Sequence, residues 1–315
     1  MNRSSVNWHG FWPASPTPFT QSGALDEEAL RRLLRLYAEQ GMHGILINGT
    51  TGEWFSQTDE ERQRVAEIAV AELKGKMTVV IGVTTFTPAH SIALAKHAMA
   101  AGADGILSTP PPYAVPNPDE VVAFYQAISD GVDAPLMVYN WPRGTNVEIT
   151  PDVAVRLAAV SNVVAIKNST GNKALFFETL EAVVDKVRVF GGFMSPIGIH
   201  AYKTVGGDGT IGGGALLGRQ YPEFYEALDR NDLARAREIA AKSAKLSSQL
   251  GNPDFSGKYG SPQAWLKAAM NLLGQPGGYP RPPLLPVDDP AKVAKIREAL
   301  GSIGLLKEEA AVAAV

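Results

Sequence analysis

Short apolar segments recur along this chain at nearly regular intervals, and this repetition limits the possible folds more than any other feature. Seven of them lie roughly 22 to 34 residues apart, which is the length of a β-strand, a helix and two loops. The segments are GILINGT (44–50), MTVVIGV (77–83), DGILSTP (104–110), APLMVYN (134–140), VVAIKNS (163–169), VRVFGGF (187–193) and GTIGGG (209–214). We therefore expect strands that alternate with helices and pair in parallel.

Between these segments the sequence carries the start signals of helices. Thr58 and Glu61 have the spacing of a capping box. Asn117 and Thr150 each precede a proline, a residue favoured at the first position of a helix. These signals support helices in the intervals between the strands.

The number of strand segments predicts an α/β fold, a closed (β/α)8 TIM barrel. The segment GFWPASPTPF (10–19) is the eighth candidate strand, although its three prolines weaken that assignment. Eight strand–helix units fit a barrel, whose usual size is about 250 residues. A doubly wound sheet is the alternative, but it would place a Gly-x-Gly-x-x-Gly turn after its first strand, and the chain has none there.

After Tyr221 the pattern changes to helical segments without strands between them. We expect a (β/α)8 catalytic barrel over residues 1–235 and a small C-terminal helical region over 236–315. The segment 274–290 is rich in proline and predicts a connection between helices. The Ala/Val-rich tail 308–315 is expected to be frayed.

Composition excludes several classes of function. A formal net charge of −3 without a basic block argues against nucleic acid or an anionic membrane as partner, and no run of 18 apolar residues is present. The absence of cysteine excludes disulfides and thiol catalysis, and the five histidines are scattered, so we expect no metal and no cofactor. The first 19 residues lack the apolar segment of a secretory signal, and we expect a cytoplasmic protein.

Lys167 is the first candidate catalytic residue, because it ends the apolar strand segment VVAIKNS. By the period of two, Val163 and Ala165 share its face, and Tyr139 ends the preceding strand at a similar height. In a barrel, the chemistry lies at these carboxyl ends of the strands. Burial would lower the pKa of this lysine and free its amine for Schiff-base formation. The alternative is a lysine that pairs with a carboxylate or reaches solvent.

Hydroxyl groups follow the second strand in GTTGE (49–53). Gly49 would let the backbone approach a ligand, while Thr50, Thr51 and the free N–H groups could hold a carboxylate. An ordinary turn with a threonine as helix cap is the alternative. A carboxylate clamp, the phenol of Tyr139 and the amine of Lys167 together suit a small-molecule 2-oxo acid such as pyruvate.

The three motifs GTTGE, YNWP (139–142) and AIKNST (165–170) give the chain a specific resemblance. From about residue 10 to about residue 300 it resembles the dihydrodipicolinate synthase/N-acetylneuraminate lyase family of pyruvate-dependent Schiff-base aldolases and lyases. The resemblance implies that Lys167 forms the imine. It also implies a homotetramer built from two tight dimers.

The resemblance implies roles for further residues. Tyr139 would relay protons with help from Thr50, and Thr51 with its neighbouring amide would bind the 2-oxo acid carboxylate. Ile211, in the segment GGDGTIGG, would offer a backbone contact to the pyruvyl unit.

Two segments depart from the family pattern. Where the synthases have an arginine for the aldehyde substrate's carboxylate, this chain has Gly144 in YNWPRGT, with Arg143 one residue earlier. A tyrosine pair of the family is replaced by TPPPYAVP, in which only Tyr113 remains. Arg143 and Tyr113 are therefore the candidates for these two substrate-binding roles. We expect the imine-forming residues to be intact and the pocket for the second substrate to differ from that of the synthases.

Several functions fit these observations. The leading one is a lyase that cleaves or condenses C–C bonds, or dehydrates a 2-keto-3-deoxy sugar acid, through Lys167. A 4-hydroxy-tetrahydrodipicolinate synthase, which condenses pyruvate with aspartate semialdehyde, is an alternative. The glycine-rich segment 206–214 could instead be a phosphate site. A catalytically silent barrel that acts as a binding module is the alternative of another class.

Overall fold

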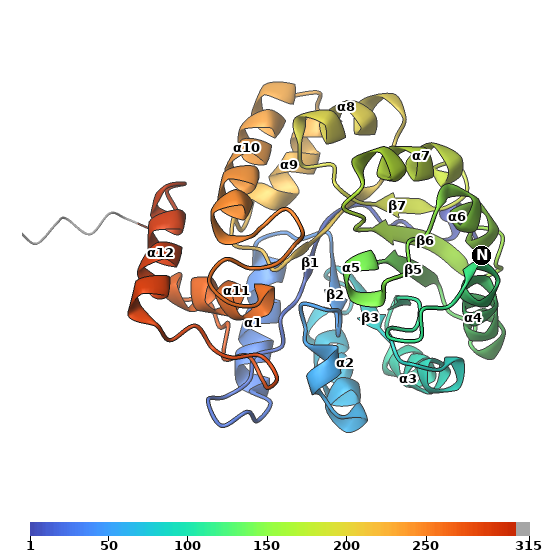
Figure 1. Cartoon of the computed structure of the whole chain (residues 1–315), viewed down its shortest axis with the longest axis horizontal. Helices are drawn as coiled ribbons and strands as arrows, with labels where there is room; N and C mark the ends of the chain where they lie inside the picture. The colour runs from blue at the N-terminus through green and yellow to red at the C-terminus, as the bar shows by residue number, and fades with distance from the viewer. Residues whose placement is uncertain (307–315) are drawn as a thin grey trace, which may run out of the picture.

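Eight parallel strands close into a barrel, and each pairs with its neighbours in the sequence (Figure 1). The computed structural model describes residues 1–306 of the chain. The strands are β1 (Gly10–Ala14), β2 (Gly44–Ile47), β3 (Thr78–Gly82), β4 (Gly105–Ser108), β5 (Leu136–Asn140), β6 (Val163–Asn168), β7 (Arg188–Phe190) and β8 (Gly209–Gly213). The predicted TIM barrel is confirmed, including the proline-bearing first strand.

Helices follow the strands and surround the barrel (Figure 1). They are η1 (Arg3–Ser5), α1 (Glu27–Glu39), η2 (Trp54–Ser56), α2 (Asp59–Leu73), α3 (Pro88–Ala101), α4 (Pro118–Gly131), α5 (Pro142–Thr145), α6 (Pro151–Leu157), α7 (Lys173–Val183), α8 (Pro196–Thr204) and α9 (Gln220–Asp229). The capping box of Thr58 and Glu61 at α2 is confirmed, and Asn117 caps α4. Thr150 stands at the N-cap of α6, but its hydroxyl bonds Asp152 and makes no cap hydrogen bond.

The C-terminal part of the described chain is helical, as predicted. It contains α10 (Leu233–Leu250), α11 (Pro262–Leu272) and α12 (Pro290–Gly301), drawn from orange to red in Figure 1. The division between residues 235 and 236 stays a prediction; both residues lie in α10. The expectation for the tail 308–315 lies outside the described residues. Within residues 1–306, no helix is long and apolar enough to cross a membrane.

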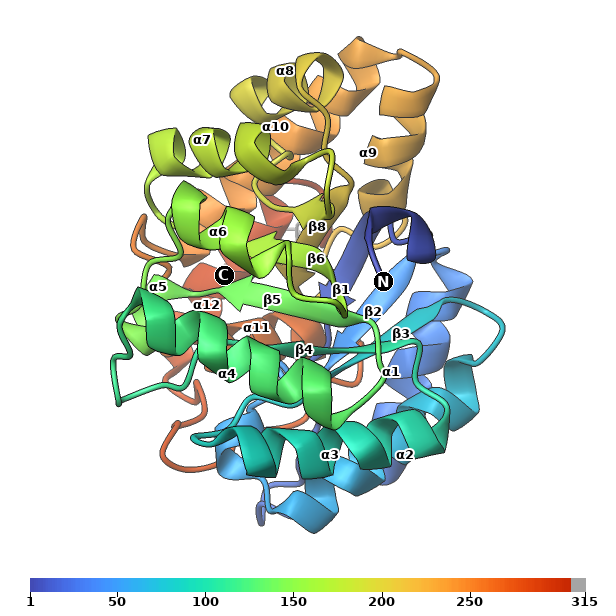
Figure 2. The ribbon, with the colours of Figure 1, turned by 90° about the vertical axis from the view of Figure 1, so that its right-hand side faces the viewer.

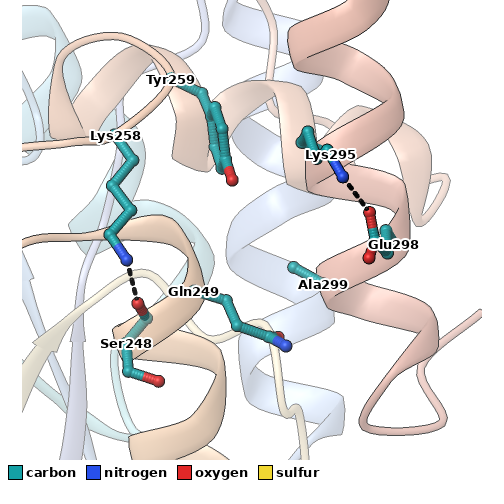
Figure 3. Close-up of a pocket in the computed structure, with 7 residues that line it drawn as sticks. All are labelled: Ser248, Gln249, Lys258, Tyr259, Lys295, Glu298 and Ala299. Carbon is teal, nitrogen blue, oxygen red and sulfur yellow. Dashed lines mark hydrogen bonds and ion pairs between the residues drawn. The ribbon is translucent and has the colours of Figure 1, made fainter.

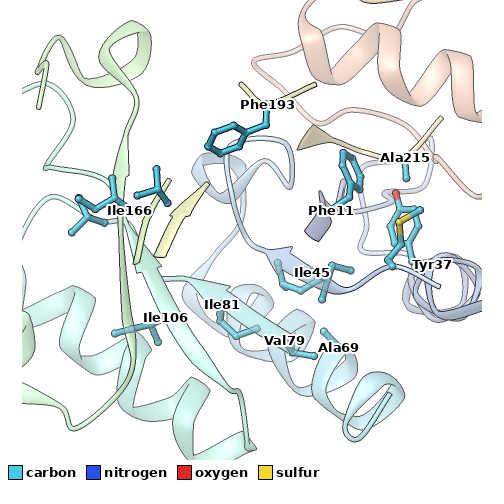
Figure 4. Packing of buried hydrophobic residues seen from close by; sticks show 14 of the residues in the cluster. Phe11, Tyr37, Ile45, Ala69, Val79, Ile81, Ile106, Ile166, Phe193 and Ala215 are labelled. Atoms are coloured by element: carbon cyan, nitrogen blue, oxygen red, sulfur yellow. The ribbon is translucent and has the colours of Figure 1, made fainter. Parts of the chain in front are cut away.

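Two apolar layers hold the barrel together. The larger layer lies between the strands and the helices, and Figure 4 shows Ile45, Ile81 and Ile166 of the strands among its members. The smaller layer fills the interior of the barrel and includes Leu46 and Tyr139. Because successive side chains of a strand point to opposite faces, each of the strands β1 to β7 contributes to both layers, while the glycine-rich β8 contributes only Ile211, to the inner one.

Strand β6 departs from this alternation at one point. Ala165 lies in the inner layer, as expected, but Val163 packs in the outer one and Val164 takes an inner position. The register between β5 and β6 shifts between Leu136 and Met137, so one extra residue of β6 is accommodated there. The expectation that Val163 shares the inner face was therefore wrong, because the sequence does not reveal the bulge.

The two ends of the barrel differ in what covers them. In Figure 2, β5 points toward α5, and the N-terminal segment lies at the opposite end. There Asp208, which precedes β8, forms ion pairs with Arg3 and Arg188 at 2.6 and 2.8 Å. This network closes the amino end of the barrel and leaves the carboxyl end for chemistry.

Candidate active site

Lys167 and Tyr139 lie side by side inside the barrel, near the carboxyl ends of neighbouring strands. They are direct register partners of β6 and β5. The Nζ atom of Lys167 lies 3.9 Å from the centroid of the Tyr139 ring, and both residues are buried. The sequence-based expectation of two groups at one height is met in the structure.

Burial controls the charge of Lys167. Its amine lies beside the ring of Tyr139, a member of the apolar inner layer, and among the residues that the structure describes no carboxylate forms an ion pair with it. Loss of hydration therefore lowers the pKa of Lys167 to about 7. Near neutral pH a large fraction of the amine is uncharged, which is the nucleophilic form. The alternative reading, a lysine paired with a barrel carboxylate, does not fit this geometry.

The phenol of Tyr139 is buried among groups that can exchange protons with it. Burial raises its pKa above the ordinary value, while hydrogen bonds with the hydroxyl side chains of Ser169 and Thr50 oppose this change. Thr50 was a candidate from the sequence, but Ser169 was missed. The sequence did contain a signal for Ser169, because residues two apart in an extended chain point to the same side, and Ser169 follows Lys167 at that spacing.

The turn after β2 presents two threonines at the mouth of the barrel. Gly49 begins this turn, and its carbonyl accepts a hydrogen bond from the N–H of Gly52 at 3.0 Å. Thr51 lies next to β8, where a Cβ atom on Gly213 would lie 3.5 Å from its Oγ1. Neither Thr50 nor Thr51 is the N-cap of the following helices. Their hydroxyls are therefore not used as helix caps, which was the alternative reading.

Ile211 belongs to β8, the strand whose carboxyl end lies next to Thr51. It lies on β8 and packs in the inner layer together with Tyr139. Its side chain is nearly buried. The structure therefore places Ile211 in the same interior as Lys167, as the resemblance implied, without testing the backbone contact to a ligand.

The C-terminal helices fix the GTTGE turn from behind, which the sequence did not indicate. Glu53 is fully buried and forms an ion pair with Lys267 of α11 at 2.5 Å. Lys267 also donates hydrogen bonds to two backbone carbonyls, those of Thr17 and Tyr279, at 2.7 and 2.8 Å. Gln263 donates to the Thr50 carbonyl at 3.0 Å. The position of Thr50 and Thr51 thus depends on α11.

We expect the variant Lys267→Met to lower the free energy of unfolding by about 3–5 kcal/mol, because the buried carboxylate of Glu53 would lose its ion-pair partner. Chemical denaturation measures this loss. The matched control is the double variant Glu53→Gln/Lys267→Met, which removes both charges and should lose clearly less. A loss below about 1 kcal/mol in the single variant would contradict the expectation.

Two of the predicted site residues, Arg143 and Tyr113, do not lie beside Lys167. Arg143 is exposed on α5, and its Nη1 donates a hydrogen bond to the backbone carbonyl of Phe255 at 2.8 Å. Tyr113, in the loop between β4 and α4, is 91% exposed. Their roles in substrate binding stay predictions.

The glycine-rich segment 206–214 does not form one phosphate site. Gly206 and Gly207 adopt left-handed conformations before β8, at the amino end of the barrel. The next residue is Asp208, whose buried carboxylate already pairs with Arg3 and Arg188, so these two guanidinium groups are engaged and not free for a phosphate. The carboxyl end of the same strand faces the GTTGE turn instead. This separation disfavours the phosphate reading.

A separate cavity of about 290 Å³ lies among the C-terminal helices (Figure 3). Its lining residues come from α10, α12 and the segment between α10 and α11, and none comes from a barrel strand. Lys258 donates to the Ser248 carbonyl, and Lys295 pairs with Glu298 (Figure 3). Both ammonium groups already have partners, so this cavity offers no free amine for imine chemistry.

Comparisons with known proteins agree with this geometry. The family model described as "Dihydrodipicolinate synthetase family" matches residues 7–300. A DapA-like lyase of Rhizobium meliloti, described as uncharacterized, is 34% identical over 96% of this chain and 98% of its own. A 4-hydroxy-tetrahydrodipicolinate synthase of Phenylobacterium zucineum is 33% identical over 95% and 98%. The solved structure of YagE, a prophage protein of the dihydrodipicolinic acid synthase family from E. coli K12 in complex with pyruvate, has a TM-score of 0.84 and 26% identity, covering 96% of this chain and all of its own.

Proposed function

This chain belongs to the dihydrodipicolinate synthetase family and is a lyase, and we propose that it acts on pyruvate or a related 2-oxo acid through a Schiff base on Lys167. The observation that carries this proposal is the buried amine of Lys167 against the phenol of Tyr139, with its pKa lowered to about 7. The pyruvate complex of YagE supports the choice of ligand.

The groups around Lys167 can perform the steps of imine formation. The neutral amine adds to the keto carbon, and the resulting carbinolamine loses one water to give the imine. Tyr139 carries protons to and from these intermediates, with the hydroxyls of Thr50 and Ser169 as its partners. Thr51 and the N–H groups of the turn that starts at Gly49 bind the carboxylate. The backbone at Ile211 contacts the pyruvyl unit.

Trapping with borohydride tests this proposal. Incubation of the protein with pyruvate and borohydride should add one pyruvyl unit, located on the peptide that contains Lys167. An adduct on Lys173 or Lys203 would contradict the assignment. A protein without any adduct would be a catalytically silent barrel or would use other chemistry.

The second substrate requires a panel assay. We expect turnover of a hydroxylated 2-oxo acid, such as a 2-keto-3-deoxy sugar acid, in cleavage, condensation or dehydration. The panel contains such acids, N-acetylneuraminate, and pyruvate with aspartate semialdehyde. The member with the highest kcat/KM identifies the reaction.

A 4-hydroxy-tetrahydrodipicolinate synthase is the second candidate, because the relative of Phenylobacterium zucineum carries that name. Two features of this chain disfavour it. Gly144 offers no side chain to a substrate carboxylate, and Arg143 is bonded to the carbonyl of Phe255. An unpaired carboxylate in a desolvated pocket costs about 2–5 kcal/mol, or roughly 30- to 4,000-fold in efficiency.

We further propose a homotetramer of two tight dimers, located in the cytoplasm, with which the cysteine-free composition is compatible. The loop between β4 and α4 supports assembly, because Tyr113 and Val115 are 91% and 51% exposed there. Light scattering at micromolar concentration should give four times the chain mass of 33.6 kDa. A mass of one chain would refute the assembly.

A further inference from the structure

We propose that Trp141 and Phe255 form an aromatic wall that receives the aldehyde part of the substrate and selects an uncharged aldehyde over a carboxylated one. The inference rests on the proposed function, because it concerns the partner that meets the pyruvyl group on Lys167. Trp141 directly follows β5, one residue beyond the pair of Tyr139 and its neighbour Asn140. An aldehyde that enters from the carboxyl end of the barrel therefore meets Trp141 before Tyr139.

Trp141 is held in place from two sides. Its ring stacks with that of Tyr139, with centroids 6.0 Å apart and an angle of 21° between the planes. Phe255 contacts it edge-on, with centroids 5.4 Å apart and an angle of 63°. Both separations lie within the favourable range for aromatic pairs. Trp141 also packs against the inner apolar layer, so it faces the interior of the barrel.

Gly144 has no side chain, and the indole ring of Trp141 occupies the space that a side chain there would fill. A Cβ atom on Gly144 would lie 2.4 Å from Cδ1 and 2.5 Å from Nε1 of Trp141. Any side chain at this position would displace the ring. The glycine and the tryptophan are thus coupled, and position 144 cannot supply a cation while Trp141 keeps this orientation.

Arg143 is the cation of α5, and its side chain points toward the loop that carries Phe255. Its Nη1 donates to the Phe255 carbonyl at 2.8 Å. Hydrogen bonds from Ser256, and in addition the charge of Arg143, lower the pKa of Asp254 beside that carbonyl. The guanidinium is therefore engaged in holding Phe255 next to Trp141. We assign Arg143 a positioning role.

The loop that carries Phe255 is shaped to present this side chain. An antiparallel bridge between Gly251 and Gly257 closes the loop, and the N–H of Asn252 donates to the Ser256 carbonyl at 2.8 Å. Phe255 adopts a left-handed conformation with φ of 63°, which is costly for a bulky residue. Phe255 as a whole remains 44% exposed. Backbone strain that presents an exposed aromatic ring is typical of a binding site.

Such a wall discriminates by charge. The face of an aromatic ring is electronegative and offers dispersion contacts to carbon, but it repels a carboxylate. A carboxylate placed there would also lose hydration without gaining a partner. An uncharged aldehyde has neither cost, so the wall favours it.

The test compares three aldehydes with pyruvate as donor: benzaldehyde and glyceraldehyde, which are uncharged, and aspartate semialdehyde. The natural protein should use at least one uncharged aldehyde with a higher kcat/KM than aspartate semialdehyde. In Trp141→Ala, efficiency with the uncharged aldehyde should fall about 10- to 200-fold, mainly through KM, while that with aspartate semialdehyde changes little. Trp141→Phe should keep most of the preference.

Arg143→Met tests the positioning role. Loss of its hydrogen bond should raise KM for the uncharged aldehyde about two- to tenfold and leave kcat close to that of the natural protein. Leu285→Ala, which truncates an exposed side chain of the 274–290 connection, is the surface control.

Pyruvate trapping distinguishes a failure of the proposed Schiff-base function from a failure of the proposed aromatic wall. All these variants should still form the pyruvate adduct on Lys167, because Lys167 and Tyr139 are retained, and the rate in Trp141→Ala reports the loss of the ring that stacks on Tyr139. If the natural protein traps no pyruvate, the proposed function fails. If trapping is normal but Trp141→Ala retains the natural preference among aldehydes, or aspartate semialdehyde is the best substrate of the natural protein, the aromatic wall is wrong.

Discussion

Replacing Lys167 with alanine should abolish both turnover and the borohydride-trapped pyruvate adduct, because no other group can supply the buried amine at this position. Mass spectrometry should show one added pyruvyl unit in the natural protein and none in Lys167→Ala. Lys173→Ala is the matched control, since its lysine is exposed at the start of α7 and should leave the adduct in place. Adduct formation in Lys167→Ala at the natural rate would contradict the assignment.

The rate of adduct formation should depend on pH through the same lysine. Because desolvation lowers the pKa of Lys167 to about 7, the reactive neutral form is the minor one below that pH. The rate should therefore fall about tenfold per pH unit on the acid side and level off above pH 8. A midpoint near the ordinary value of 10.5 would show that the amine is hydrated in solution.

The lowered pKa has a consequence for stability as well. Between pH 7 and 10.5 the unfolded chain keeps a proton on Lys167 that the folded chain has lost. The contribution of this group to the free energy of unfolding thus rises with pH across that window and is least favourable below pH 7. Lys167→Met should remove this dependence.

Tyr139→Phe should keep the fold and the ability to bind the 2-oxo acid but lower kcat about 100- to 10,000-fold, the usual loss when a positioned proton-transfer group is removed. The fold should survive because the phenylalanine ring retains the contacts with Lys167 and Trp141. Single-turnover kinetics with pyruvate measure the rate of imine formation, the step in which Tyr139 transfers protons. Turnover near that of the natural protein would show that Tyr139 is a packing residue.

Ser169→Ala tests whether Ser169 exchanges protons with the phenol of Tyr139 or only packs against it. Ser169 and Thr50 both hydrogen-bond with Tyr139, so either hydroxyl can exchange protons with it. Loss of one of two partners should reduce kcat less than Tyr139→Phe does. Ser169→Thr keeps a hydroxyl and is the conservative control.

The sequence alone was sufficient for the barrel and for the pair at its centre. Strand spacing and β-branched composition are local properties that each segment carries by itself, so eight strands could be counted before any contact was known. Lys167 and Tyr139 were found because parallel strands of a barrel end at one edge. The bulge at Val164 was not predictable, since it depends on how β5 and β6 fit together.

The tertiary structure decided which residues surround that pair and what each of them is free to do. Arg143 was a substrate-binding candidate by its place in YNWPRGT, yet it contacts Phe255, 112 residues away. Gln263 reaches the Thr50 carbonyl across 213 residues. Local patterns determine the strands and the end at which chemistry lies, whereas contacts over such separations arise only when the C-terminal helices pack against the barrel, because no local pattern encodes them.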